Sequence, residues 1–254
     1  MALPFTTDDG FGARARLGLI VLQADETIEP EFARIMALEN VVLHMTRIPM
    51  AAEITPETLM SMKANLPAAA ALLPEIPFDA IGYGCTSAST VIGVDGVEAA
   101  VRSVHPDAAV SNPISAVLAA CEALEAKRIG FVTPYRPDVS AAMRELLEKN
   151  GLTIAGFGSF EESDDRVVGR ISPASVLDAI KSVAAMGDCD AVFVSCTNLR
   201  VAGIVSEAEA AIGKPVFSSN LALAWHMLRL AGIQDDIPGL GRLYRMPLAD
   251  KAGE

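Results

Sequence analysis

Short apolar runs rich in β-branched residues alternate along the chain with longer stretches whose apolar positions recur at helical spacing. The short runs are typical of strands that a parallel sheet buries on both faces. The longer stretches, clearest at residues 139–149, 174–186 and 221–230, place apolar side chains on one side and polar ones on the other. Alternating strand and helix signals predict an α/β fold built on parallel sheets.

Three of the predicted strands occur twice, in the same order. Residues 79–87 (DAIGYGCTS) match residues 190–198 (DAVFVSCTN), 111 residues further on, and residues 16–21 match residues 128–133 at an offset of 112. A weaker third pair joins residues 110–112 to residues 217–220. Ordered pairs at a nearly constant offset indicate a tandem duplication. We therefore expect two pseudo-symmetric α/β lobes, each with a parallel sheet flanked by helices.

The duplication also divides the chain. We expect an N-terminal lobe at residues 14–124 and a C-terminal lobe at residues 125–220. Residues 221–254 are expected to form a helix and tail that pack back across the lobes. Because open parallel sheets bind ligands at the carboxyl ends of their strands, the site is expected in the cleft between the lobes.

Composition excludes several classes of protein. The chain has 254 residues, of which 51% are hydrophobic and 20% charged, which is incompatible with disorder. No apolar run approaches the about 20 residues of a membrane helix, and the N-terminus lacks a signal-peptide pattern. The net charge of −12 would repel nucleic acid. With only four cysteines, we expect a cytoplasmic protein with reduced thiols and no nucleic-acid or membrane partner.

Cys85 and Cys196 occupy matching positions of the repeat, each at the expected carboxyl end of a strand. In two lobes related by a pseudo-two-fold axis, these thiols would meet across the cleft. A helix starting after each cysteine would lower the thiol pKa from about 8.5. Two opposed thiols can remove and deliver a proton on opposite faces of one carbon, as a cofactor-free racemase requires. The alternative is a buried structural role, which we expect for Cys121 and Cys189.

Other chemistries lack their motifs. None of the three histidines has metal-ligand spacing with the cysteines, and no dinucleotide, P-loop or nucleophile-elbow motif occurs. We therefore expect neither a metal nor a cofactor. Tyr135, held between Pro134 and Pro137 at a strand end, is the best candidate besides the cysteines, with a packed loop tyrosine as the alternative.

Five motifs occur in a specific order: GLIV at residues 18–21, GCTSAS at 84–89, VTPY at 132–135, GRI at 169–171 and SCT at 195–197. With them the chain resembles the aspartate/glutamate racemase superfamily, in its branch of maleate cis-trans isomerases and arylmalonate decarboxylases. The family fold has two pseudo-symmetric α/β lobes around the site. The resemblance implies that Cys85 and Cys196 are catalytic. It also implies that hydroxyl and backbone donors of Thr86, Ser87, Tyr135 and Thr197 hold a substrate carboxylate.

Within the family that the chain resembles, the number of cysteines distinguishes decarboxylases from isomerases. Arylmalonate decarboxylases keep only the second cysteine, so Cys85 disfavours plain decarboxylation. Maleate isomerases keep both: one thiolate adds to the double bond, and the other thiol stabilises the intermediate while the bond rotates. Those isomerases carry Asn where this chain has Asp25 and Asp165. Thr197 brings the second cysteine closer to the Cys-Thr motif of amino-acid racemases.

The two acidic positions bear on the substrate. An ionised carboxylate repels a substrate carboxylate but attracts a cationic nitrogen. We therefore predict a cofactor-independent isomerase that racemises a small amino acid or derivative by two-base proton transfer. Maleate cis-trans isomerisation is the alternative, and decarboxylation and non-catalytic binding of a small molecule stay open.

Both acids also have structural alternatives: Asp25 can cap a helix starting near Thr27, and Asp165 can belong to an acidic surface patch. The expected partner is a small carboxylate-bearing substrate. Assembly into a homo-oligomer stays open.

Overall fold

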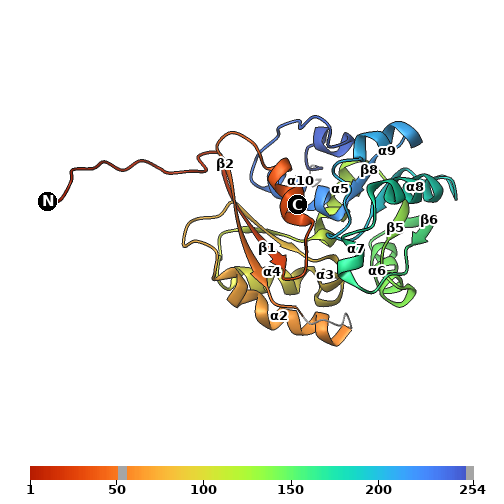
Figure 1. The fold of residues 1–254 in the computed structure, drawn as a ribbon, viewed down its shortest axis with the longest axis horizontal. Helices are drawn as coiled ribbons and strands as arrows, with labels where there is room; N and C mark the ends of the chain where they lie inside the picture. The colour runs from red at the N-terminus through yellow and green to blue at the C-terminus, as the bar shows by residue number, and fades with distance from the viewer. Residues whose placement is uncertain (51–55, 250–254) are drawn as a thin grey trace.

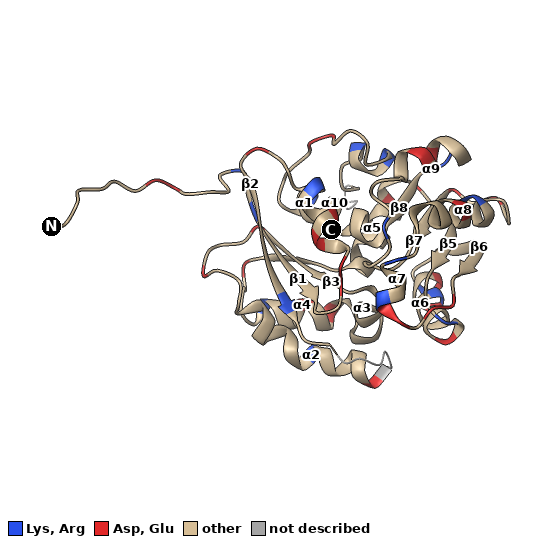
Figure 2. Ribbon diagram, viewed as in Figure 1, with Lys and Arg blue, Asp and Glu red and all other residues tan. Residues whose placement is uncertain are grey.

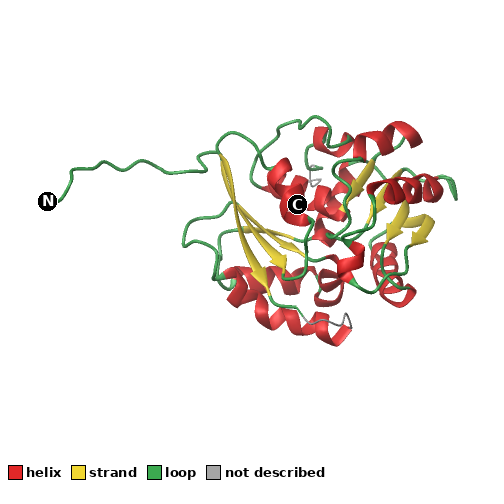
Figure 3. Ribbon diagram, in the orientation of Figure 1, coloured by secondary structure: helices red, strands yellow, loops and turns green. Residues whose placement is uncertain are grey.

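The computed structural model describes residues 1–50 and 56–249. Two four-stranded parallel sheets lie next to one another, with helices packed on their faces (Figures 1 and 3). The first sheet has the order β2-β1-β3-β4 and the second the order β6-β5-β7-β8. The strands of the two sheets are β1 (Ala15–Leu22), β2 (Val41–Ile48), β3 (Ala80–Gly84), β4 (Ala109–Ser111), β5 (Arg128–Thr133), β6 (Thr153–Ser159), β7 (Ala191–Val194) and β8 (Val216–Ser218).

The two sheets have the same topology, which confirms the predicted two-lobed α/β fold. Each repeated sequence segment takes the same place in its lobe: β1 corresponds to β5, β3 to β7 and β4 to β8. The central strands β1, β3, β5 and β7 are almost entirely buried, as their apolar sequences predict.

The amphipathic stretches form helices, within a few residues of the predicted ends. The helices are α1 (Ile28–Ile35), α2 (Pro56–Ala70), α3 (Thr86–Ile92), α4 (Val94–Arg102), α5 (Pro113–Ala123), α6 (Pro137–Lys149), α7 (Asp165–Val168), α8 (Pro173–Ala184), α9 (Val205–Ile212), α10 (Ser219–Leu230) and the 3-10 helix η1 (Arg242–Arg245). None of the helices in the described residues is both long and apolar enough to cross a membrane. Charged residues lie mostly on the outer helices and loops (Figure 2).

Helix α10 joins the two lobes. It follows β8 of the second sheet but packs against α5, β3 and β4 of the first lobe. Almost all of its residues are buried, including Trp225, so it is not the half-exposed helix that its sequence predicts. Arg229 fastens the segment after it by donating hydrogen bonds to the carbonyl oxygens of Ile233, Tyr244 and Met246. The lobe boundaries at residues 124 and 220 stay a prediction.

Candidate active site

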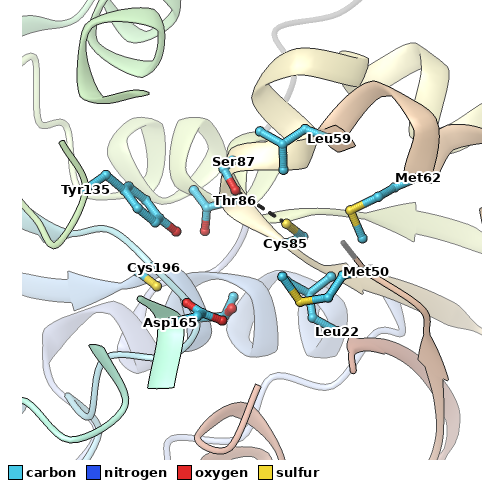
Figure 4. Close-up of a pocket in the computed structure, with 11 residues that line it drawn as sticks. Leu22, Met50, Leu59, Met62, Cys85, Thr86, Ser87, Tyr135, Asp165 and Cys196 are labelled. Atoms are coloured by element: carbon cyan, nitrogen blue, oxygen red, sulfur yellow. Dashed lines mark hydrogen bonds between the residues drawn. The ribbon is translucent and has the colours of Figure 1, made fainter. Parts of the chain in front are cut away.

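Cys85 and Cys196 line one pocket between the two lobes (Figure 4). Cys85 follows β3, Cys196 follows β7, and each is at most 2% exposed. The space between the lining side chains is about 360 Å³, part of it open to solvent. The other lining residues are Leu22, Met50, Leu59, Met62, Thr86, Ser87, Tyr135, Asp165 and Thr197. Of the eight candidate residues, the fold thus brings together every one except Asp25.

Cys85 is the N-cap of α3. Its Sγ accepts a hydrogen bond from the backbone N–H of Ala88 at 3.3 Å and lies 3.7 Å from the Ser87 hydroxyl. These donors lower the thiol pKa, but burial outweighs them and raises it to about 11. The expected lowering of this pKa is therefore wrong. The free energy needed to remove a thiolate from water is larger than the stabilisation that the start of a short helix provides.

Cys196 is held differently. The chain after it forms a loop, and the next helix begins at Val205, so the expectation of a helix start at this cysteine is wrong. Its φ of +97° is a conformation that costs a residue with a side chain about 1–3 kcal/mol. Its Sγ accepts the backbone N–H of Asn198 at 3.3 Å. Burial first, and then the charge of Asp165, raise its pKa well above the ordinary value.

A tyrosine faces each thiol. The Tyr135 hydroxyl points into the pocket (Figure 4) and lowers the pKa of Cys196 by hydrogen bonding. Tyr83 lowers the pKa of Cys85, and its hydroxyl lies 3.7 Å from the Sδ of Met62. The sequence analysis missed Tyr83, although its place two residues before Cys85 puts both side chains on one face of the strand. The repeat has Val194 at the position that matches Tyr83, so the two tyrosines come from non-equivalent positions.

The two predicted acids have different surroundings. Asp25 caps α1: its Oδ1 accepts the N–H groups of Thr27 and Ile28, both at 2.8 Å. Burial raises the pKa of Asp25, and a hydrogen bond with the side chain of Thr197 opposes this rise. Asp165 lies in the pocket, whereas its neighbour Asp164 caps α7 at the surface. Burial, reinforced by the charge of Asp25, raises the pKa of Asp165 to about 6.

Asn198 connects the loop of the second cysteine to both acidic segments. Its Oδ1 accepts the N–H of Glu26 at 3.1 Å, and its Nδ2 donates to the carbonyl oxygen of Asp165 at 2.8 Å. Sequence reasoning missed this role, but its signal was the last position of the repeated motif, where the first lobe has Ser87.

Glu31 of α1 was also missed. Its Oε1 accepts the N–H groups of Val201 and Ala202, both at 2.8 Å, and its Oε2 accepts the side chain of Asn220 at 2.8 Å. Burial raises the pKa of this carboxyl group. The first lobe therefore holds the loop that follows Cys196, and no local sequence pattern signals this contact.

Two comparisons of sequence cover nearly the whole chain. The model of the arylmalonate decarboxylase family matches residues 17–244. The maleate isomerase of Nocardia farcinica is 28% identical over 246 residues, 92% of this chain and 97% of that protein. The arylmalonate decarboxylase of Bordetella bronchiseptica is 31% identical over 132 residues, 51% of this chain and 55% of that protein.

Solved structures share the fold. A variant of the Nocardia farcinica maleate cis-trans isomerase with a covalently bound succinylcysteine intermediate has a TM-score of 0.83 at 28% identity, covering 91% of this chain and 98% of its own. An alanine variant of the maleate isomerase Iso from Pseudomonas putida S16, with maleate, has a TM-score of 0.83 at 25% identity, covering 91% and 97%. With the family match over residues 17–244, these likenesses show that the chain belongs to the arylmalonate decarboxylase family.

Proposed function

We propose that this protein is a cofactor-independent isomerase that converts a small cis-unsaturated carboxylate, of the maleate type, into its trans isomer. The observation that carries the proposal is that Cys85 and Cys196, one from each lobe, line a single pocket. Maleate isomerases of Nocardia farcinica and Pseudomonas putida match over nine-tenths of the chain, at 28% and 24% identity. They favour cis-trans isomerisation over the racemisation that the sequence analysis preferred.

The structure also weakens the reason for preferring a racemase. That preference rested on two acids, Asp25 and Asp165, placed to attract a cationic nitrogen. Asp25 accepts the N–H groups at the start of α1 and is hydrogen-bonded to Thr197, so of the two acids Asp165 is the one that lines the pocket.

We assign the nucleophile to Cys85. Its Sγ lies among three donors, the backbone N–H of Ala88 and the hydroxyls of Ser87 and Tyr83, all of which favour the thiolate. The charge of Asp165 opposes a thiolate at Cys196 more than any other neighbouring charge does. Cys196 is therefore the better proton donor, and Cys85 the better thiolate.

The reaction then needs only the two thiols. The Cys85 thiolate forms an S–C bond to one alkene carbon, and the π electron pair moves to the other carbon, where the Cys196 thiol delivers its proton. Rotation about the new single bond brings the carboxylate to the trans side. The Cys196 thiolate removes the proton again, the double bond re-forms and the S–C bond breaks. The protonated adduct of maleate is a succinylcysteine, the species bound in the Nocardia farcinica variant.

Hydroxyl groups supply the contacts that hold the substrate carboxylate. Ser87, Tyr135 and Thr197 line the pocket, and Tyr135 also faces Cys196. On the other side, apolar side chains surround Cys85 (Figure 4), and they keep water from the thiolate and from the covalent adduct.

The experiment is to incubate the protein with maleate and to follow fumarate by proton NMR. Cys85→Ser and Cys196→Ser should each lower kcat at least about a thousandfold, because each removes one of the two reacting thiols. Cys121→Ser is the matched control, since this buried cysteine lies outside the pocket, and its kcat should stay within twofold. Turnover that survives in Cys85→Ser would refute the mechanism.

The same protein in D₂O tests the racemase alternative. We expect no deuterium at the α-carbon of any amino acid or hydantoin-like derivative in a panel. Cysteine-dependent deuterium incorporation, without conversion of maleate, would replace the proposed function by racemisation.

A further inference from the structure

Among the described residues, the pocket is lined by one carboxyl group and by no cationic side chain. Asp165 lies there with Cys85, Cys196 and Tyr135, and none of the described lining residues is Lys, Arg or His. Figure 4 shows its carboxyl group directed into the space beside Cys196. An anionic ligand in this pocket therefore meets a negative charge with no fixed positive charge to balance it.

Three arginines near this end of the pocket are each paired with another acid. These pairs, with N···O distances between 2.7 and 3.2 Å, are Arg166–Asp164, Arg170–Glu26 and Arg47–Glu29. All of these side chains are at least one-third exposed, so solvent screens their charges and they do not neutralise Asp165.

The charged groups that face Asp165 are all carboxylates. The charged and neutral groups around it come from the loop before α1, from α7 itself and from the opposite walls of the pocket: Asp25, Glu26, Asp164, Asn198, Cys85, Cys196 and Tyr135. Only the Asn198 side chain favours the ionised form, while burial and the neighbouring carboxylates oppose it and raise the pKa to about 6. The carboxyl group is thus ionised at neutral pH and takes up a proton in mildly acidic solution.

We propose that Asp165 determines which ligand charge the pocket accepts. The Asp165 carboxyl group and the ligand group next to it must share one hydrogen bond, so one of the two groups must carry a proton. At neutral pH the ligand must supply this proton. The substrate class is therefore an unsaturated monocarboxylate whose other end carries an N–H donor, such as an amide or an ammonium group. At acidic pH a protonated Asp165 donates to a second carboxylate instead. This inference rests on the proposed function for the place of the ligand between the two thiols.

Saturated ligands test this charge preference without turnover. Succinamate has one carboxylate and one amide, succinate has two carboxylates, and neither has the carbon–carbon double bond that the reaction needs. By calorimetry at pH 7.5, the wild-type protein should bind succinamate at least tenfold more tightly than succinate. Asp165→Asn should reverse this order, because its amide donates to a carboxylate and no longer repels it.

Asp164→Asn is the matched control. It removes a neighbouring carboxylate that is already paired with Arg166, so the ratio of the two affinities should stay within threefold of that of the wild type. If Asp165→Asn does not fold, Asp165→Ser takes its place and should remove the preference for succinamate.

Three results would overturn the inference. They are an unchanged affinity ratio in the Asp165 variant, an equal change in Asp164→Asn, and no binding of either ligand to any of the proteins. Failure of the proposed function would be seen separately, as no conversion of maleate or of its half-amide.

Discussion

The hydroxyl of Thr86 donates a hydrogen bond to the Oγ of Ser219 at 2.9 Å, and the same Oγ accepts the backbone N–H of Cys196 at 3.1 Å. Thr86 follows the first cysteine in one lobe, and Ser219 begins α10 after the last strand of the other. A single side chain thus connects the two Cys-Thr motifs. It also fixes the backbone of Cys196 at the residue whose φ is +97°.

Ser219→Ala should impair catalysis more than stability explains. It leaves the Cys196 N–H without its buried acceptor, which costs about 1–3 kcal/mol, and frees the strained backbone at the thiol. We expect kcat to fall at least tenfold. Ser218→Ala is the control: it removes only the cap hydrogen bond to Leu221, so its melting temperature should fall while kcat stays within twofold. Equal loss of kcat in both variants would count against the link.

Tyr83→Phe should make Cys85 less reactive without affecting Cys196. Loss of the phenol donor raises the Cys85 pKa, so its alkylation by iodoacetamide at pH 8 should slow by about three- to tenfold. Tyr135→Phe should slow alkylation of Cys196 instead. Peptide mass spectrometry measures both thiols in one sample. If either variant slows both thiols equally, the assignment of one tyrosine to each cysteine is wrong.

Asp165→Asn should stabilise the fold at neutral pH. Burial raises the Asp165 pKa from 3.8 to about 6, so the folded state is penalised when this group ionises. The penalty is absent below pH 4, grows between pH 4 and 6 and is complete above pH 6. Removing it should add about 1–3 kcal/mol at pH 7.5 and nothing at pH 4. Thermal denaturation at both pH values measures this, and a lower melting temperature at pH 7.5 would contradict it.

Asp25 should behave as a helix cap. Asp25→Ala removes the acceptor of two backbone N–H groups and should cost about 0.5–2 kcal/mol of stability, whereas Asp25→Ser keeps a capping oxygen and should cost less. In both variants the KM for maleate should stay within twofold of that of the wild type. A tenfold change in KM with Asp25→Ser would show that this carboxyl group acts on the substrate.

The sequence predicts the fold well because each strand pattern occurs twice, so that each copy supports the interpretation of the other. Buried parallel strands need apolar runs, and the same runs recur in the same order at 111 or 112 residues' distance, so the segments around Cys85 and Cys196 could be recognised as equivalent. The helices at residues 139–149 and 174–186 followed from their periodicity. The full burial of α10 did not, since it depends on the packing of α10 against α5 and β3 of the other lobe.

The candidate site was predictable where strand ends determine position, and not where the lobes meet. Cys85, Thr86 and Ser87 follow β3, and Cys196 and Thr197 follow the equivalent strand. Tyr83 could have been found from strand alternation. Glu31 could not, because its partners Val201 and Ala202 lie 170 and 171 residues away in the other lobe.

The sequence by itself determined the class of fold, the duplication and the pair of cysteines, because each of these depends only on local residue types and their spacing. Only the tertiary structure decided that Asp25 caps a helix while Asp165 enters the pocket, since both are acids near strand ends. It also decided that both thiols have raised pKa values. Burial and neighbouring charges set a pKa, and these arise only when segments far apart in the chain pack together.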